Sequence, residues 1–137
     1  MTTDEKLKQE QADEEMISQA FDHLLKSYLT SKHRKKVEII TKAFNFAKQA
    51  HKGVKRRSGE PYIMHPIAVA QIACSEIGLG STSICAALLH DVVEDTDYTV
   101  EDIENLFGPK VAQIVDGLTK ISGGIFGDRA SAQAENF

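Results

Sequence analysis

The chain has 137 residues, of which 42% are hydrophobic and 26% charged, with a formal net charge of −4. This length and balance are typical of one globular domain that buries a core of its own. No apolar stretch is long enough to cross a membrane, the amino terminus is polar and acidic, and the negative net charge argues against general binding to nucleic-acid backbone. We therefore expect a cytoplasmic protein with no membrane partner and no direct DNA binding.

The two cysteines, Cys74 and Cys85, lie inside apolar runs and lack Cys-x-x-Cys spacing. This pattern is typical of small core side chains in a reducing compartment rather than of a disulfide or a zinc site.

Apolar residues recur at helical spacing along most of the chain, and no alternating strand pattern of useful length occurs, so we predict an all-α fold. Residues 1 to about 12 are polar and are expected to fray. An amphipathic helix follows over 14–28, with a break at Thr30-Ser31. A second helix is expected to end near His51, with Gly53 as its stop signal. We interpret His51 as a favourable cation at that helix end.

A third helix is predicted with Pro66 in its first turn, and Gly78-Leu79-Gly80 is expected to end it. Ser81 or Thr82 could cap a fourth helix that leads to His90.

Two short helices are predicted after the fourth. Thr99 and Asp102 resemble a capping box before a helix over 100–106. Gly108-Pro109 then separates it from a sixth helix that contains residues 111–118.

The pair His90-Asp91 closes the apolar run Ile84–Leu89 and is followed by Glu94 and Asp95. On a helix, His90 and Glu94 share one face, and Asp91 and Asp95 share the neighbouring face. Ionisable groups at the edge of a core are normally retained with a partner, and this set suits a divalent cation and its water. The alternative is that the His-Asp pair is only a polar helix end.

His65 precedes Pro66, which favours an extended conformation at the mouth of a helix. If the third and fourth helices pack antiparallel across their short turn, His65 meets His90 and Asp91. The alternative is that His65 only hydrogen-bonds a loop carbonyl group.

A basic loop over 53–62 contains Lys55, Arg56, Arg57, Ser58 and Gly59. Its composition alone favours a solvated surface loop. Its position just before His65 favours a binding role, in which guanidinium groups fork onto phosphate or stack on a base.

The end of the chain is unusual. After the glycine-rich loop over 122–127, residues 131–137 look like the first turns of another amphipathic helix that stops at Phe137. We expect this to be a cut through a longer protein, with a tail that is disordered or anomalously packed.

Long motifs in this chain resemble the hydrolase domain of the RelA/SpoT (Rel) stringent-response enzymes, members of the HD superfamily. The similar segments are Arg57-Ser-Gly-Glu-Pro-Tyr-Ile-Met-His65-Pro, Leu89-His90-Asp91-Val-Val-Glu94-Asp95-Thr, Phe107-Gly108 and Val115-Asp116-Gly117-Leu-Thr119-Lys120. The resemblance covers about residues 40–122. It implies an HD-domain-like helical bundle over 31–137, truncated before its C-terminal helices, with residues 1–30 forming a polar segment and an amphipathic helix.

The resemblance also implies a chemistry: manganese-dependent hydrolysis of guanosine tetra- and pentaphosphate to GDP or GTP and pyrophosphate. Carried over by position, the metal ligands are His65, His90 and Asp91. Glu94 and Asp95 position or activate the attacking water. The nucleotide contacts come from the basic loop: Arg56, Arg57 and Ser58.

One part of the family's pattern is missing from the sequence. The fourth ligand of the family is an aspartate in an Asp-Arg-Leu-His-Asn-Met stretch, which this chain does not contain, and neither Asp116 nor Asp128 matches that motif. We therefore expect weak or no metal binding by the chain itself. A ribosome contact is expected only through domains absent here, and apolar surface at the cut could drive a non-native oligomer.

Three functions remain open at this stage. The first is the pyrophosphohydrolase just described. The second is an HD phosphohydrolase that acts on another nucleotide. The third is a non-enzymatic regulatory HD domain, against which the intact motif residues up to Asp95 argue.

Overall fold

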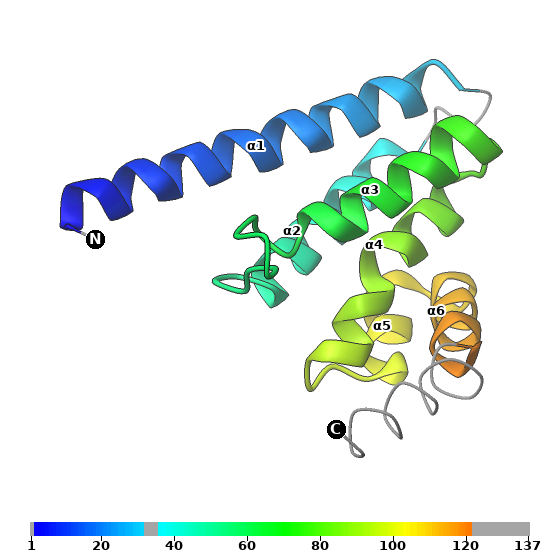
Figure 1. Ribbon diagram of the computed structural model, residues 1–137. Helices are drawn as coiled ribbons and strands as arrows, with labels where there is room; N and C mark the ends of the chain where they lie inside the picture. Colours follow the sequence, from blue (N-terminus) through cyan, green and yellow to red (C-terminus); the bar gives the residue numbers. More distant parts are fainter. Residues whose placement is uncertain (1, 32–35, 122–137) are drawn as a thin grey trace.

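The computed structural model describes residues 2–31 and 36–121, so the predictions for the glycine-rich loop and the tail lie outside the described residues. The helices are α1 (Thr3–Leu29), α2 (Val37–Ala50), α3 (Met64–Ile72), the π-helical η1 (Ala73–Ile77), α4 (Ser81–Asp95), α5 (Val100–Phe107) and α6 (Pro109–Ile121) (Figure 1). Within these ranges the only β-type pairing is an isolated bridge between Lys55 and Pro61. The predicted all-α fold is confirmed.

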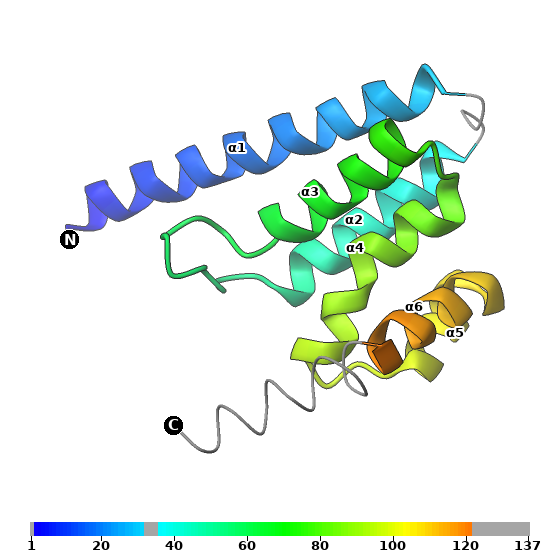
Figure 2. The same cartoon turned by 45° about the vertical axis from the view of Figure 1, so that its right-hand side comes forward.

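The helices form a bundle around α4, which contacts α2, α3 and α6 (Figures 1 and 2). The long α1 runs alongside α3, and α5 and α6 pair with each other at the other end of the molecule. The core draws large, fully buried side chains from most helices: Leu24, Tyr28, Ile40, Ile84, Leu88, Leu89, Val92, Ile103 and Val115. Burial of each Leu or Ile side chain stabilises the fold by about 1.5–3 kcal/mol. Because α2, α3 and α6 all pack against α4, this helix is fixed from three sides.

The helix α1 begins earlier than the sequence suggested. Thr2 caps it, since its Oγ1 accepts a hydrogen bond from the Glu5 N–H at 3.2 Å, and Asp4 and Glu5 lie in the first turn, where negative charge is favourable. Residues 3–12 are therefore helical although they are exposed, and the expectation that they fray was wrong. The predicted break is correct, because α1 ends at Leu29 with Thr30 as its C-cap.

The start of α3 differs from the prediction at one residue that matters. Pro66 lies in the first turn, as expected, but α3 begins at Met64, so His65 is helical rather than extended. The first turn tolerates proline because its N–H groups lack helical partners in any case. The helix then widens into η1 and ends at Gly78, whose φ of 79° lies in the left-handed region.

The cap of α4 was predicted wrongly and the cap of α5 correctly. Gly80 precedes α4 without a side-chain cap, and Ser81 is already helical. At α5, Thr99 Oγ1 accepts from the Asp102 N–H at 3.2 Å, and Asp102 Oδ2 accepts from the Thr99 N–H at 3.0 Å. This reciprocal pair is a capping box even though aspartate replaces the usual glutamate.

Both cysteines are free and buried, as predicted for core side chains. Burial raises the pKa of both thiols, that of Cys85 to about 12, so neither is a ready thiolate. In the described part of the chain, none of the helices combines the length and the apolar character that a membrane span requires. The expected cytoplasmic location stays a prediction.

Candidate metal and nucleotide site

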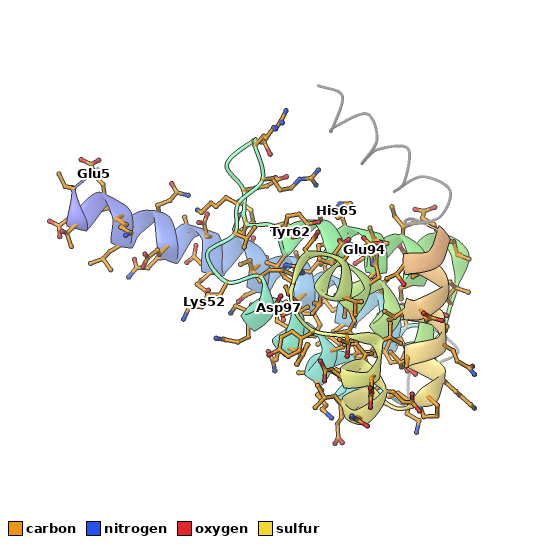
Figure 3. The ribbon with its side chains drawn as sticks, turned by 90° about the horizontal axis from the view of Figure 1, so that it is seen from below. Glu5, Lys52, Tyr62, His65, Glu94 and Asp97 are labelled. Atoms are coloured by element: carbon orange, nitrogen blue, oxygen red, sulfur yellow. The ribbon has the colours of Figure 1, made fainter. Side chains whose placement is uncertain are left out.

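The polar end of α4 meets the start of α3. His65 Nε2 lies 3.8 Å from Asp91 Oδ2, and His90 Nε2 lies 3.2 Å from Asp91 Oδ1. The Asp91 carboxylate therefore has one imidazole beside each oxygen. The meeting of His65 with the His90-Asp91 pair, predicted from the short turn between their helices, is confirmed. Figure 3 shows His65, Tyr62 and Glu94 in one region, where the start of α3, the loop before it and the end of α4 converge.

The hydrogen bonding of His90 fixes what its other nitrogen can do. His90 Nδ1 lies 2.9 Å from the Ala87 carbonyl oxygen, and a carbonyl oxygen can only accept, so Nδ1 carries the proton. In the neutral ring, Nε2 then presents a lone pair toward the Asp91 carboxylate. Two acceptors at 3.2 Å repel unless a proton or a cation lies between or beside them. This tautomer is the one that a metal-ligating histidine needs.

Asp91 is the buried member of the group, with 5% of its surface exposed. Its Oδ2 atom is buried and has no hydrogen-bond partner. A buried carboxylate oxygen without a partner is costly, and a divalent cation would remove that cost.

The donor chemistry thus fits a metal, but the arrangement is incomplete. Among residues 2–31 and 36–121, no group of three or more His, Cys, Asp or Glu side chains is placed so that it could hold an ion.

Glu94 and Asp95 form the last turn of α4 and are exposed. Asp95 is connected to the group through Tyr62. Burial raises the pKa of Tyr62, and the charge of Asp91 and hydrogen bonding with Asp95 raise it further. The Tyr62 hydroxyl therefore remains protonated and can donate to these carboxylates.

Sequence reasoning missed two residues of this site, Tyr62 and His51. The C-cap residue of α2, His51, is only 4% exposed, and its ring centroid lies 4.8 Å from that of Tyr62. Burial lowers the pKa of His51, against the opposing charges of Asp91 and Asp95, so the interpretation of His51 as a helix-end cation was wrong. Its Nε2 is buried and lacks a hydrogen-bond partner. The only signal in the sequence was its place beside the basic loop.

The basic loop is a small hairpin that presents its charged residues to solvent. The Arg56 N–H donates to the Glu60 carbonyl oxygen at 2.9 Å, and Gly59 turns the tip with a φ of 94°. Arg57 and Ser58 are exposed at that tip, and the Arg56 guanidinium lies 3.9 Å from the Glu60 carboxylate. In the described part of the chain, no hydrogen bond or ion pair joins Arg56, Arg57 or Ser58 to His65, His90 or Asp91. The structure thus brings His65 and His90 next to Asp91, as predicted. The predicted nucleotide contacts of the basic loop stay a prediction.

Comparison with known proteins agrees with this fold. Residues 43–136 match the HD domain family, so the chain belongs to that family of helical domains. The sequence is 50% identical over 101 residues to a guanosine-3′,5′-bis(diphosphate) 3′-pyrophosphohydrolase of Vibrio cholerae, which covers 74% of this chain. It is 44% identical over 121 residues, 88% of this chain, to the bifunctional (p)ppGpp synthase/hydrolase SpoT of Escherichia coli. The resemblance to the RelA/SpoT hydrolase domain is thereby confirmed.

The chain spans only a small part of these relatives, 14% of the Vibrio protein and 17% of the Escherichia protein. A solved structure of a metazoan ortholog of SpoT, described as hydrolyzing ppGpp, is also similar, with a TM-score of 0.55 and 38% identity. That match covers 58% of this chain and 46% of the other. The family suggests a divalent metal.

Proposed function

We propose that this chain provides the metal and nucleotide site of a guanosine 3′,5′-bis(diphosphate) 3′-pyrophosphohydrolase. The reaction removes the 3′-pyrophosphate from guanosine tetra- or pentaphosphate and leaves GDP or GTP. The observation that carries the proposal is the Asp91 carboxylate set between His65 and His90, with one buried oxygen that lacks a hydrogen-bond partner. The names of the relatives give the substrate.

In this proposal His65, His90 and Asp91 hold a manganese ion. When bound, the ion supplies a more acidic water and neutralises charge on the departing pyrophosphate. His90 is prepared for this role by its Nδ1 hydrogen bond to Ala87, which leaves Nε2 free to ligate. A further carboxylate, which the resemblance assigns to an Asp-Arg-Leu-His-Asn-Met stretch not present in this sequence, would complete the set.

The remaining roles follow from exposure and charge. Glu94 and Asp95 lie within one helical turn of Asp91 and open to solvent, where they can orient and deprotonate a water. Arg56, Arg57 and Ser58 offer exposed donors that suit phosphate oxygens.

The test is pyrophosphate release from guanosine tetraphosphate with manganese. It uses two proteins: this chain, and an extended chain to which a segment with an Asp-Arg-Leu-His-Asn-Met stretch is added after Phe137. Activity in the extended chain that disappears in its His90→Ala variant supports the proposal. Activity in both proteins would mean that His65, His90 and Asp91 suffice to hold the metal. Absence of release in both, with hydrolysis of another nucleotide, would reject the substrate.

A regulatory, non-enzymatic HD domain is the second candidate. The observation that favours it is the lack, within the described residues, of a complete set of metal-holding side chains. Guanosine tetraphosphate that binds to the extended chain without being hydrolysed would select this candidate.

We also propose a division into residues 1–30 and a hydrolase domain over 31–137. Limited proteolysis of the extended chain tests this division. A ribosome contact through other domains and a non-native oligomer stay predictions.

A further inference from the structure

The first buried residue of α1 is a carboxylate. Every residue from 3 to 12 is exposed, but Asp13 is only 8% exposed. Its Oδ2 pairs with Lys55 Nζ from the basic loop, and its Oδ1 accepts a hydrogen bond from Gln9 Nε2 at 2.9 Å. The hydrogen bond from Lys55 lowers the pKa of Asp13, so the carboxylate is charged. Asp13 is thus fully partnered, and its main partner lies 42 residues away in the loop.

Lys55 occupies the base of the hairpin that presents Arg56, Arg57 and Ser58. Lys55 forms the bridge with Pro61, and one residue outward on each strand the Arg56 N–H donates to the Glu60 carbonyl oxygen at 2.9 Å. On the inner side, the Tyr62 N–H donates to the Val54 carbonyl oxygen at 2.9 Å. A contact that fixes Lys55 therefore fixes both strands of the hairpin, including the strand that leads to Tyr62 and His65.

The ion pair also decides which charges remain available to a ligand. The Lys55 ammonium is engaged by Asp13, although 43% of its side chain is exposed. The free positive charge of the loop is then concentrated at its tip. The loop lies beneath the middle of α1, and the first part of α1 projects past it (Figures 1 and 2).

We propose that Asp13 is a positioning residue of the nucleotide site: through Lys55 it holds the basic loop in place for a guanosine polyphosphate. The inference rests on the proposed function and adds α1, which precedes the matched HD segment, to the site. The proposed metal-holding side chains are on α3 and α4. Loss of the Asp13–Lys55 ion pair, which we call the brace, therefore weakens substrate binding without changing the chemical step. Misplaced positioning groups can cost up to about 100-fold in rate, and for this brace we expect KM to rise about tenfold with kcat unchanged.

The experiment compares Asp13→Asn with a matched control, Glu14→Gln. Glu14, the next residue of α1, makes an ion pair with Lys48 on α2 at 2.6 Å instead of with the loop residue Lys55. In the extended chain, Asp13→Asn should raise KM for guanosine tetraphosphate, and Glu14→Gln should not. The double variant Asp13→Lys with Lys55→Asp restores the pair and should lower KM again.

Hydrogen exchange in the 137-residue chain separates failure of this inference from failure of the proposed function. The amides of Arg56, Gly59 and Tyr62 donate hydrogen bonds within the loop and should exchange faster in Asp13→Asn than in Glu14→Gln. Faster loop exchange in Asp13→Asn, together with no hydrolysis of guanosine tetraphosphate by the extended chain, would reject the proposed substrate. It would still support the role of the Asp13–Lys55 ion pair in holding the loop. Unchanged exchange, or an unchanged KM in an active enzyme, would overturn the inference. A fall in kcat equal to the rise in KM would overturn it too, because it would indicate general loss of structure.

Discussion

The two halves of α4 are built for opposite purposes. Residues 84–89 are buried and apolar, and they place Ile84, Leu88 and Leu89 fully inside the core. Residues 90–95 carry a histidine and three carboxylates, of which Asp91 is buried with one oxygen that lacks a hydrogen-bond partner. The first half stabilises the fold. The second half carries ionisable side chains, and burial of one of them, Asp91, is unfavourable for stability. One rigid helix thus fixes a costly group in place by means of the packing that precedes it.

The largest effect that this comparison predicts concerns Asp91. Asp91→Asn should lower the rate of hydrolysis by the extended chain at least about 100-fold. Substitution of a residue that only orients a metal ligand already lowers metal affinity or activity about 10–100-fold. Manganese affinity, measured by titration calorimetry, should fall with it. The free energy of unfolding of the metal-free protein should be unchanged or higher, since Asn removes a buried charge.

The control for that variant is Asp97→Asn, an exposed carboxylate two residues beyond α4. It should leave hydrolysis, metal affinity and stability as they are. Hydrolysis that survives in Asp91→Asn would remove the metal role from the His-Asp pair.

The apolar half should show the reverse behaviour. Leu88→Ala deletes a fully buried side chain and should cost about 2–5 kcal/mol of unfolding free energy, measured by urea denaturation. Metal affinity of the folded fraction should stay the same. Leu118→Ala on α6, where leucine is exposed, should change the stability by less than about 0.5 kcal/mol. A large loss of metal affinity in folded Leu88→Ala would show that the two halves are not separable.

The basic loop provides a third, smaller effect. Arg57→Ala removes an exposed guanidinium at the tip of the loop, and a charge-assisted hydrogen bond contributes about 1.5–3 kcal/mol. KM for guanosine tetraphosphate should therefore rise about tenfold, with kcat retained, and the difference should shrink as salt is added. Lys8→Ala, an exposed cation of α1, is the matched control. An equal effect of both variants would indicate only a general attraction to positive charge.

The sequence predicted the helices and the main ligand contact because these depend on local patterns. The end of α2 near His51 and the Thr99–Asp102 box follow from spacing within a few residues of a turn. The meeting of His65 with Asp91 follows from the short connection over 78–80, which lets α3 and α4 pack against each other. The sequence did not predict the pairing of Asp13 with Lys55 or the tilted ring contact between His51 and Tyr62, because both depend on how separate segments pack. The same holds for His65: helix formation from Met64 outweighed the local preference before Pro66.

The smallest predicted effect tests His51, which lies beside the polar half of α4. Burial lowers its pKa in the folded protein, whereas in the unfolded chain it takes up a proton near the usual value of about 6.5. Below about pH 6.5 the unfolded state therefore binds more protons than the folded state. The free energy of unfolding is thus unaffected by His51 above about pH 6.5, and it decreases as the pH falls below that value. The slope cannot exceed about 1.4 kcal/mol per pH unit for one proton. His51→Gln should flatten the dependence of unfolding free energy on pH between about 5 and 7 in metal-free buffer, and His23→Gln, an exposed histidine on α1, should not. A slope that persists unchanged in His51→Gln would show that His51 is not its source.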